Sequence, residues 1–422
     1  MDDDHDDAEL SSALEGIGRA ELVVGIPSFG SARAIGDVVA AVVGGVAAHI
    51  PGIPCVLVNA DSGSRDGTPD VARRAAGDRY PVVTAAHAPP PQYRLATSDP
   101  GFPGRGDALR TVFRVVERLG ARACVLVDAD VRAITPGWMP LLAEPVLRGT
   151  VELVAPLYAG HRYDGMLTSS LIYPLTRALY GRRVRQPVGG HFGLSGALAG
   201  RLLRSGVWDR EGAPSLDLWM TTMALADGLR VGQARLGAGR GGTRRGAAGL
   251  GASFAHVVGT VFALMEEYRP AWWAVVGTED VPTFGPAHPV GLEPVSVNVD
   301  RMISTFRQGV AELMPVWRRA LGARTCAALA ALEQDAAPEF RFPATLWAQA
   351  VYDAAAAYHR RALARRHLLR AMIPLYLGRI ADFVLRTASG DGAQVEAEVE
   401  SGCRVFESLK PHLLDRWDAP RP

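Results

Sequence analysis

The sequence predicts an α/β protein with a mostly parallel, Rossmann-like sheet, followed by an α-helical C-terminal region. Two observations carry this prediction. Short runs of β-branched and other apolar residues alternate with helix-length segments between residues 21 and 127, as is typical of parallel strands joined by helical crossovers. Beyond about residue 295, the apolar residues instead follow long helical patterns without a strand signal.

The elements of the first half follow one another in a regular order. After an acidic head, the predicted elements are strands at 21–26, 54–59, 81–86 and 123–127 and helices at 33–49, 66–76 and 107–119. Ligands of such open sheets bind beyond the carboxyl ends of the strands. The loops PSFG (27–30), DSGS (61–64) and DAD (128–130) all begin there, so we expect the functional site in these loops.

The second half divides into a loop-rich part and a helical part. Arginine and glycine dominate residues 230–251, which we predict to be a surface loop or lid because apolar residues are too few for a core element. Helices are predicted at 301–321, 342–367 and 369–387, and Pro374 is expected to start or kink the last one. The expected division is an acidic flexible head at 1–20, an α/β domain at 21–290 and an α-helical region at 291–422.

Composition excludes several classes of function. The 422 residues are 48% apolar and 21% charged, and 45 basic against 44 acidic side chains give a net charge of +1, too small a field to hold a nucleic acid. Lys410 is the only lysine, which leaves Schiff-base chemistry and a Walker-type phosphate lysine almost no residue to use. The four cysteines lack a Cys-x-x-Cys spacing, which argues against a zinc site. The acidic N-terminus and the lack of an apolar stretch near roughly 18 to 20 residues predict a cytoplasmic protein without a membrane span.

Two carboxylates leave the sheet together after the apolar run at 123–127. Asp128 and Asp130 are spaced to share one divalent cation, or to bind it directly and through water, and such oxygen ligands suit Mg²⁺ or Mn²⁺. An isolated Asp-x-Asp is more often a solvated turn. Its position directly after a buried strand favours a metal site.

Two further loops contain residues suited to a nucleotide. The segment DSGSRDGT (61–68) offers short polar side chains and glycines for a nucleobase and ribose, although the same residue types also form helix N-caps. The segment GRGD (104–107) precedes a helix, where backbone amides and Arg105 can approach a diphosphate closely. In isolation, such a segment is more often a plain turn.

In their order and spacing, the PSFG, DSGSRDGT, GRGDAL and DAD segments resemble the GT-A glycosyltransferases. The resemblance is to the retaining branch that includes glucosyl-3-phosphoglycerate synthase, glucosylglycerate synthase and mannosylglycerate synthase. That branch has Gly-Lys-Gly-acid where this chain has GRGD, a Gln-Pro segment similar to RQPVGGH (185–191), and an acidic helix similar to LDL (216–218). With PLYLGR (374–379), the resemblance covers about residues 20–390.

The resemblance implies a GT-A nucleotide-sugar domain at 21–290 and a metal-assisted hexosyl transfer, with retention, to a small hydroxy acid such as glycerate or 3-phosphoglycerate. Asp128 and Asp130 are implied to hold Mg²⁺ or Mn²⁺ against the leaving diphosphate, and Asp217 and His191 are the implied catalytic residues. The residues implied to bind the donor are Pro27, Phe29, Asp61, Gly63, Arg105, Asp128, Ala129 and Gly190. The implied partners are a nucleoside diphosphate sugar, a small anionic acceptor and a second copy of the chain, with no nucleic acid.

Two positions depart from the family pattern. Relatives carry a metal-binding histidine at the end of a Leu-Gly-x-x-x-His segment, which in this chain ends in Gly241, so the third metal ligand is missing. His191 stands where relatives carry an acid, and a functional and a structural role stay equally open for it. Arg240, Arg244 and Arg245 have the charge to compensate near the diphosphate, although a solvated loop is the more common role of such residues.

Three alternatives to this function were weighed. An inverting glycosyltransferase acting on a lipid or polysaccharide usually carries Gln-x-x-Arg-Trp, which this sequence lacks. An altered, non-catalytic relative that binds a nucleotide sugar or a partner protein is motivated by Gly241 and His191. A Rossmann dehydrogenase is disfavoured because no Gly-x-Gly-x-x-Gly follows the first strand.

Overall fold

The computed structural model describes residues 10–87, 104–209, 215–238, 247–288, 291, 297–332 and 338–419. The chain divides into two compact units that alternate along the sequence. The first consists of Met1–Ala159, Val188–Arg244 and Val281–His288, and the second of Gly160–Pro187, Arg245–Asp280 and Pro289–Pro422. Residues 160–187 and 245–280, which the sequence analysis assigned to the α/β domain, therefore belong to the second unit.

The first unit is built on a sheet whose eight strands have the order β3-β2-β1-β4-β6-β5-β7-β8. The strands are β1 (Leu22–Ser28), β2 (Cys55–Asp61), β3 (Val82–Ala86), β4 (Ala123–Leu126), β5 (Leu153–Ala159), β6 (Phe192–Ser195), β7 (Val231–Ala238) and β8 (Thr283–Phe284). All neighbouring pairs are parallel except those of β6, which runs antiparallel to β4 and β5. The mostly parallel α/β sheet predicted from the sequence is thus confirmed.

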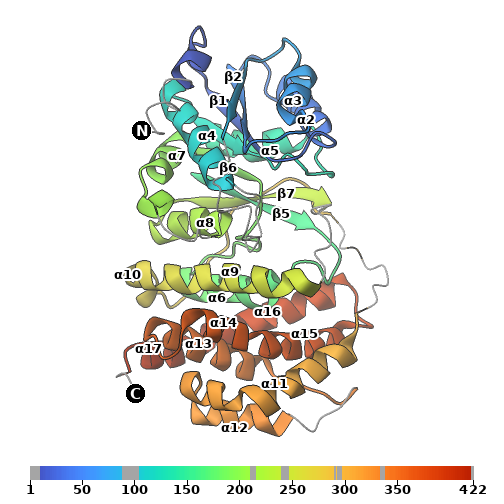
Figure 1. Cartoon of the computed structure of the whole chain (residues 1–422), viewed down its shortest axis with the longest axis vertical. Helices are drawn as coiled ribbons and strands as arrows, with labels where there is room; N and C mark the ends of the chain where they lie inside the picture. Colours follow the sequence, from blue (N-terminus) through green and yellow to red (C-terminus); the bar gives the residue numbers. More distant parts are fainter. Residues whose placement is uncertain are drawn as a thin grey trace. The chain divides into compact units, whose positions relative to one another are not determined.

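Helices cover both faces of this sheet. They are α2 (Ile35–His49), α3 (Thr68–Ala76), α4 (Arg105–Leu119), α5 (Trp138–Leu147), α7 (Gly196–Leu203), the 3₁₀ turn η3 (Gly206–Asp209) and α8 (Leu216–Ala226). Figure 1 shows α2, α3 and α5 on one side of β1, β2 and β4, with α4 and α7 on the other. The sheet is therefore the middle layer of three, as in other α/β domains.

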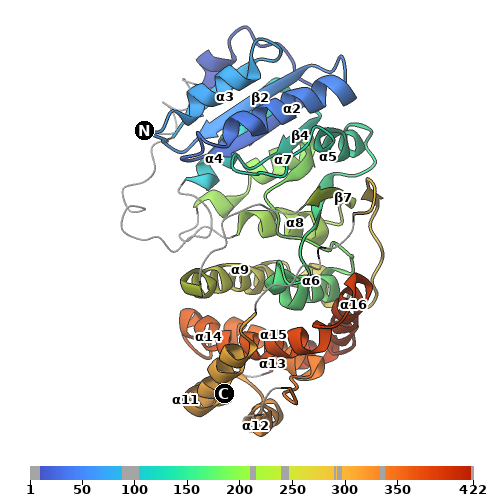
Figure 2. The same cartoon turned by 90° about the vertical axis from the view of Figure 1, so that its right-hand side faces the viewer.

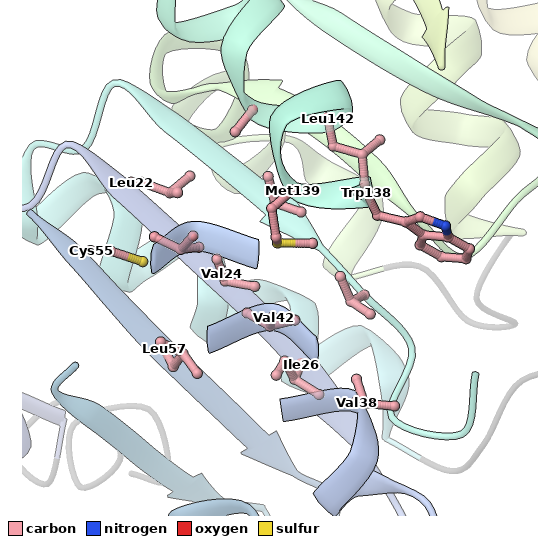
Figure 3. Packing of buried hydrophobic residues seen from close by; sticks show 14 of the residues in the cluster. Leu22, Val24, Ile26, Val38, Val42, Cys55, Leu57, Trp138, Met139 and Leu142 are labelled. Atoms are coloured by element: carbon pink, nitrogen blue, oxygen red, sulfur yellow. The ribbon is translucent and has the colours of Figure 1, made fainter. Parts of the chain in front are cut away.

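Alternating side chains of β1 contribute to both layers of the core. Val24 and Ile26 point to the same side and pack with Val42 of α2, as Figure 3 shows. Gly25 lies between them and faces α4, where an added Cβ would lie 2.5 Å from a methyl carbon of Val112. Because no side chain fits there, glycine allows α4 to pack directly on the strand.

The prediction of a surface loop at residues 230–251 is wrong at both ends of this range. Residues 231–238 form β7, and residues 247–251 begin α9; residues 239–246 lie outside the described part of the chain. β7 is buried although it contains few large apolar residues. Gly232 lets Phe284 of β8 come so near that an added Cβ would lie 2.8 Å from its ring, and the buried amide of Gln233 donates to Thr283 Oγ1 at 3.0 Å.

The second unit is α-helical, which confirms the helical C-terminal region. Its helices are the π-helical turn η2 (Thr168–Ile172), α6 (Tyr173–Tyr180), α9 (Ala247–Glu267), α10 (Arg269–Trp273), α11 (Val299–Ala320), α12 (Ala323–Ala331), α13 (Ala344–His359), α14 (Arg365–Ala371), α15 (Ile373–Thr387), α16 (Gly392–Ser408) and α17 (Lys410–Trp417). Figure 2 shows α13, α14 and α15 side by side, with α16 against α6.

Two details of this unit refine the sequence prediction. The helix expected at 342–367 is two helices, because Arg361 adopts a left-handed conformation (φ 54°) that ends the first of them. Pro374 lies in the first turn of α15 and therefore starts this helix without kinking it.

Lys410, the only lysine of the chain, is buried at the start of α17. Its Nζ donates to the carbonyl oxygens of Trp272 (2.6 Å), Val275 (2.6 Å) and Leu179 (3.4 Å), and burial lowers its pKa to about 8. These carbonyls lie at or just beyond the C-terminal ends of α6 and α10. One ammonium group therefore satisfies the exposed acceptors of two helix ends.

One helix of the described residues differs from the expectation that the chain lacks a long apolar stretch. Gly249–Glu267, within α9, is long and apolar enough to cross a membrane by length and composition, and 44% of this stretch is buried. At the N-terminus, residues 10–14 are helical, while most of the predicted acidic head, residues 1–9, lies outside the described part.

Candidate functional site

The parallel strands place the predicted site loops beside one another. Ser28, the last residue of β1, pairs in register with Asp61, the last residue of β2. Pro27 is buried in β1. Phe29 lies directly after the end of β1. It is 38% exposed, which is unusual among the large apolar residues that the structure describes. Its ring is therefore available to stack on a planar ligand at this edge of the sheet.

Asp61 is the buried centre of the loop after β2. Its Oδ1 accepts hydrogen bonds from the hydroxyls of Ser28 (2.8 Å) and Ser64 (2.6 Å), and its Oδ2 accepts from the N–H groups of Gly63 (3.1 Å) and Ser64 (2.7 Å). The residue is 1% exposed. The carboxylate implied to contact the nucleobase thus has four donors from the chain itself, and a ligand would have to displace one of them to bind it.

Three hydrogen bonds tie the loop after β1 to the loop after β2. The donor and acceptor pairs are Gly30 N–H to Ser64 Oγ (2.8 Å), Ser31 N–H to Thr68 Oγ1 (2.9 Å) and Ala32 N–H to Asp66 Oδ2 (3.1 Å). The hydrogen bond that Asp66 accepts from the Thr68 hydroxyl is the main cause of its lowered pKa. Both loops are therefore held in shape before any ligand arrives, which reduces the entropy lost on binding.

The N-terminus of α4 approaches the same loop very closely. Gly104, with φ +75°, precedes the helix, and an added Cβ would lie 2.9 Å from Ser62 Oγ. The Ser62 hydroxyl is buried and has no hydrogen-bond partner among the described residues. The first N–H groups of α4 therefore lie next to the loop after β2, at a helix end that favours an anion.

Arg105, the first residue of α4, joins two carboxylates from distant parts of the chain. Its Nη2 lies 3.3 Å from Asp128 Oδ1 and donates to Asp217 Oδ1 at 3.0 Å. Asp128 follows β4, and Asp217 lies in the first turn of α8. The three side chains are only 15%, 16% and 9% exposed, respectively. The structure thus brings together three charged residues that the resemblance implies for donor binding, for the metal and for catalysis.

The loop after β4 offers two carboxylates of different exposure. Asp130 is exposed, Asp128 is mostly buried, and Ala129 between them is buried. Among the described residues, no three or more His, Cys, Asp or Glu side chains group into a metal site. Mg²⁺ is commonly bound by one or two carboxylates together with phosphate oxygens and water, so this pair fits such an ion beside a bound diphosphate. Gly241 and the arginines at 240, 244 and 245 lie outside the described residues.

His191, one of the two implied catalytic residues, is fully buried in the first unit. Its Nδ1 is hydrogen-bonded to the hydroxyl of Tyr158, and its ring packs edge-to-face on Trp138 with the ring centres 5.0 Å apart. Gly190 before it is buried as well. Of the two roles that the sequence left open for His191, this packing favours the structural one.

The sequence assigns no individual role to several polar residues that shape the site. Ser64 and Thr68 hold the loops through their hydroxyls, and a serine or threonine just after a strand end was the available signal for such local hydrogen bonds. His87 follows β3, where its N–H donates to the carbonyl oxygen of Asp61 at 2.7 Å. Its Nε2 is hydrogen-bonded to the Thr111 hydroxyl of α4 at 2.9 Å. No sequence pattern marks this pair, because the two residues lie 24 positions apart.

Comparison with known proteins adds a similarity to solved structures. No protein-family model matches the chain, and no curated protein matches it. The chain is similar to the crystal structure of glucosyl-3-phosphoglycerate synthase from Mycobacterium tuberculosis in complex with phosphoglyceric acid. The TM-score is 0.40 at 21% identity, and the match covers 62% of this chain and 84% of that chain. The same enzyme with Mn²⁺, UDP-glucose and phosphoglyceric acid gives a TM-score of 0.41 at 22% identity over 62% and 83% of the two chains. A further mycobacterial protein gives 0.41 at 24% identity over 62% and 78%.

Proposed function

We propose that the protein is a retaining glycosyltransferase that moves a hexose from a nucleoside diphosphate sugar to a small hydroxy-acid acceptor such as glycerate or 3-phosphoglycerate. The observation that carries the proposal is the contact of Arg105 with both Asp128 and Asp217 at the carboxyl edge of a parallel sheet. A cation between two carboxylates of different origin is suited to a reaction in which negative charge develops on a leaving diphosphate. We place this activity in the cytoplasm.

The donor nucleoside binds, in this proposal, at the two tied loops. Phe29 supplies an exposed ring for the base, and Gly63 keeps the backbone of the second loop open to the ribose with φ +83°. Asp61 acts indirectly, by holding this loop through its four hydrogen bonds. The diphosphate then reaches the N-terminus of α4, where backbone N–H groups and Arg105 bind its oxygens.

Asp128 and Asp130 would hold the divalent cation, Mg²⁺ or Mn²⁺, beside the bound diphosphate. When bound, this ion supplies neutralisation of the charge on the leaving group. Arg105 does the same from the other side, since its guanidinium is always protonated and donates in a fixed fork.

Asp217 faces the acceptor. Its position in the first turn of α8 puts its carboxylate beside Arg105, where it can accept a hydrogen bond from the acceptor hydroxyl and orient it. In a retaining transfer the bond from the anomeric carbon to the phosphate oxygen breaks, and the bond to the acceptor oxygen forms on the same face. The acceptor proton passes to the leaving phosphate, so Asp217 orients the hydroxyl and stays ionised.

One observation favours a second candidate, a relative that binds a nucleotide sugar without turning it over. Gly241 stands where the resemblance expects a third metal ligand, and the described residues offer only the carboxylate pair of the loop after β4. With fewer protein ligands, the metal is held more weakly. Neutralisation of the leaving diphosphate, on which turnover depends, then rests more on Arg105. Turnover decides between the two candidates, because both bind the donor.

The first experiment is thermal unfolding with UDP-glucose, GDP-mannose and related donors, each with and without Mn²⁺ or Mg²⁺. A ligand at 100 times its dissociation constant adds about 2.7 kcal/mol to the free energy of unfolding, which a shift in melting temperature detects. The donor that shifts it is then incubated with glycerate and with 3-phosphoglycerate, and the anomeric configuration of the product is read by NMR. A metal-dependent shift with a retained anomer supports the enzyme.

Matched variants make this experiment specific to the site. Asp130→Ala is expected to abolish transfer and keep the fold, while Arg132→Gln, which changes another exposed charge of the same loop, is expected to keep transfer. Gly241→His is expected to tighten metal binding. Transfer at wild-type rate by Asp130→Ala with metal present contradicts the metal site; a donor-dependent shift without product with any acceptor supports the non-catalytic candidate.

A further inference from the structure

We infer that Arg105 acts as an internal cation of the ligand-free site, which a nucleoside diphosphate must draw away from Asp128 before a divalent cation binds tightly there. This inference rests on the proposed function, because it assigns an order of events to the same site. It makes metal binding and nucleotide binding strongly coupled in this protein.

The geometry supports the inference directly. The same guanidinium nitrogen, Nη2, forms an ion pair with Asp128 Oδ1 at 3.3 Å and donates a hydrogen bond to Asp217 Oδ1 at 3.0 Å, so one cation lies beside both carboxylates. All three side chains are largely buried, so water screens these ion pairs only weakly. A divalent cation that uses Asp128 Oδ1 would meet a positive group only 3.3 Å from that oxygen. In the absence of other anions, the two cations therefore compete.

A diphosphate resolves this competition. It brings two or three negative charges to the N-terminus of α4, where Arg105 is the first residue. The Arg105 backbone is fixed in the helix, but its long side chain can rotate from the carboxylates to the phosphate oxygens. Asp128 then loses its internal cation at the moment when the phosphates add ligands for the metal. Each ligand improves the site for the other, and by linkage the two affinities rise by the same factor.

The same movement uncovers the second carboxylate. Asp217 Oδ1 accepts a hydrogen bond from Arg105 in the ligand-free protein, and this hydrogen bond breaks when the guanidinium turns to the diphosphate. An acceptor hydroxyl is then the natural replacement donor. Because this hydrogen bond breaks only when Arg105 turns to the diphosphate, acceptor binding follows donor binding.

The test measures binding of Mn²⁺ itself, by the loss of the free-ion electron paramagnetic resonance signal, with and without UDP. For the wild-type protein, we expect UDP to tighten Mn²⁺ binding about tenfold or more. For Arg105→Gln without UDP, we expect Mn²⁺ to bind about tenfold more tightly than to the wild type, and we expect UDP to add much less than in the wild type. Arg105→Lys should lie between the two, because an ammonium group lacks the guanidinium fork.

Arg132→Gln is the matched control. Arg132→Gln removes one positive charge from the loop after β4, which also carries Asp128. Because Arg132 forms no ion pair with the described residues, the Mn²⁺ affinity of this variant should equal that of the wild type with and without UDP. Circular dichroism of each variant confirms that the fold is intact. If Arg105→Gln does not fold, the comparison of Arg105→Lys with Arg132→Gln carries the same test.

The outcomes separate this inference from the proposed function. Equal Mn²⁺ affinity of wild type and both Arg105 variants without UDP overturns the inference and leaves the glycosyltransferase proposal intact. Mn²⁺ binding that survives unchanged in Asp128→Asn refutes the metal site itself, and with it both proposals. Tighter Mn²⁺ binding confined to the Arg105 variants supports the inference even if no sugar donor is yet known.

Discussion

Replacing Asp61 by asparagine tests whether this carboxylate holds the site or binds the ligand. The asparagine side chain has the same shape as that of aspartate, but only its oxygen accepts hydrogen bonds, because its nitrogen is a donor. The four donors of Ser28, Gly63 and Ser64 are divided between Oδ1 and Oδ2, so an amide can keep two of these bonds at most. With the amide oxygen toward the two N–H groups, the amide nitrogen faces the hydroxyls of Ser28 and Ser64. Each of these hydroxyls already accepts a hydrogen bond, from Asn59 and from Gly30 respectively, so both must turn to accept another.

The loss can be scaled from these contacts. A hydrogen bond to a charged group contributes about 1.5–3 kcal/mol, and two such bonds disappear in Asp61→Asn. The loop is half-buried on the side of Gly63 and can relax, so we expect the lower part of this range, a decrease of about 3 kcal/mol in the free energy of unfolding. Donor binding should weaken as well, because the loops are then less ordered before the ligand arrives.

The assay is urea unfolding followed by circular dichroism, combined with donor titration of the same variant. Asp70→Asn is the control. Asp70 lies in the first turn of α3, directly after the same segment, and its ion pair with Arg73 is exposed (65% and 58%), so the stability should change by less than about 1 kcal/mol. Unchanged stability of Asp61→Asn with complete loss of donor binding would refute the reasoning, because the carboxylate would then serve the ligand directly.

Three further predictions concern other buried groups. Lys410 should react with an amine-selective reagent at least about tenfold more slowly in the native protein than in urea, measured by peptide mapping. For Asp353, burial would raise the pKa, but the hydrogen bonds led by that from His412 lower it below the usual value. Its contribution to stability is therefore present above about pH 4 and lost below it, so the difference in unfolding free energy between wild type and Asp353→Asn should shrink between about pH 5 and pH 2. His191→Phe should lower the urea midpoint by losing the bond to Tyr158 and leave donor affinity at the wild-type level.

The regular part of the fold was predictable because its strands are rich in Val and Leu. The run at 21–26 corresponds to β1 and that at 54–59 to β2, each shifted by one or two residues. β6 was missed because four residues are too short for a periodic signal. β7 was missed because its burial depends on Gly232 and on a satisfied Gln233, and neither feature is visible without the neighbouring strand.

The members of the candidate site were more predictable than their contacts. Arg105 and Asp217 are 112 positions apart, and each is indicated by a separate sequence motif, so the sequence does not show that they are in contact. Their pairing depends on the fold, which brings the first turn of α4 beside the first turn of α8. The role of Asp61 likewise depends on hydrogen bonds from the hydroxyls of Ser28 and Ser64. A sequence motif shows that these serines are present but not where their hydroxyls point.

The alternation of the two units along the chain has a consequence for how the protein is made. Arg177 of α6 is buried between Glu400 and Glu407 of α16, which follow it by 223 and 230 positions. At a synthesis rate of about 5–20 residues per second, α6 leaves the ribosome roughly 10–45 s before its partners exist. During that interval its guanidinium and apolar face lack their native cover, which makes the middle of the chain, and not its end, the natural site for a chaperone to hold.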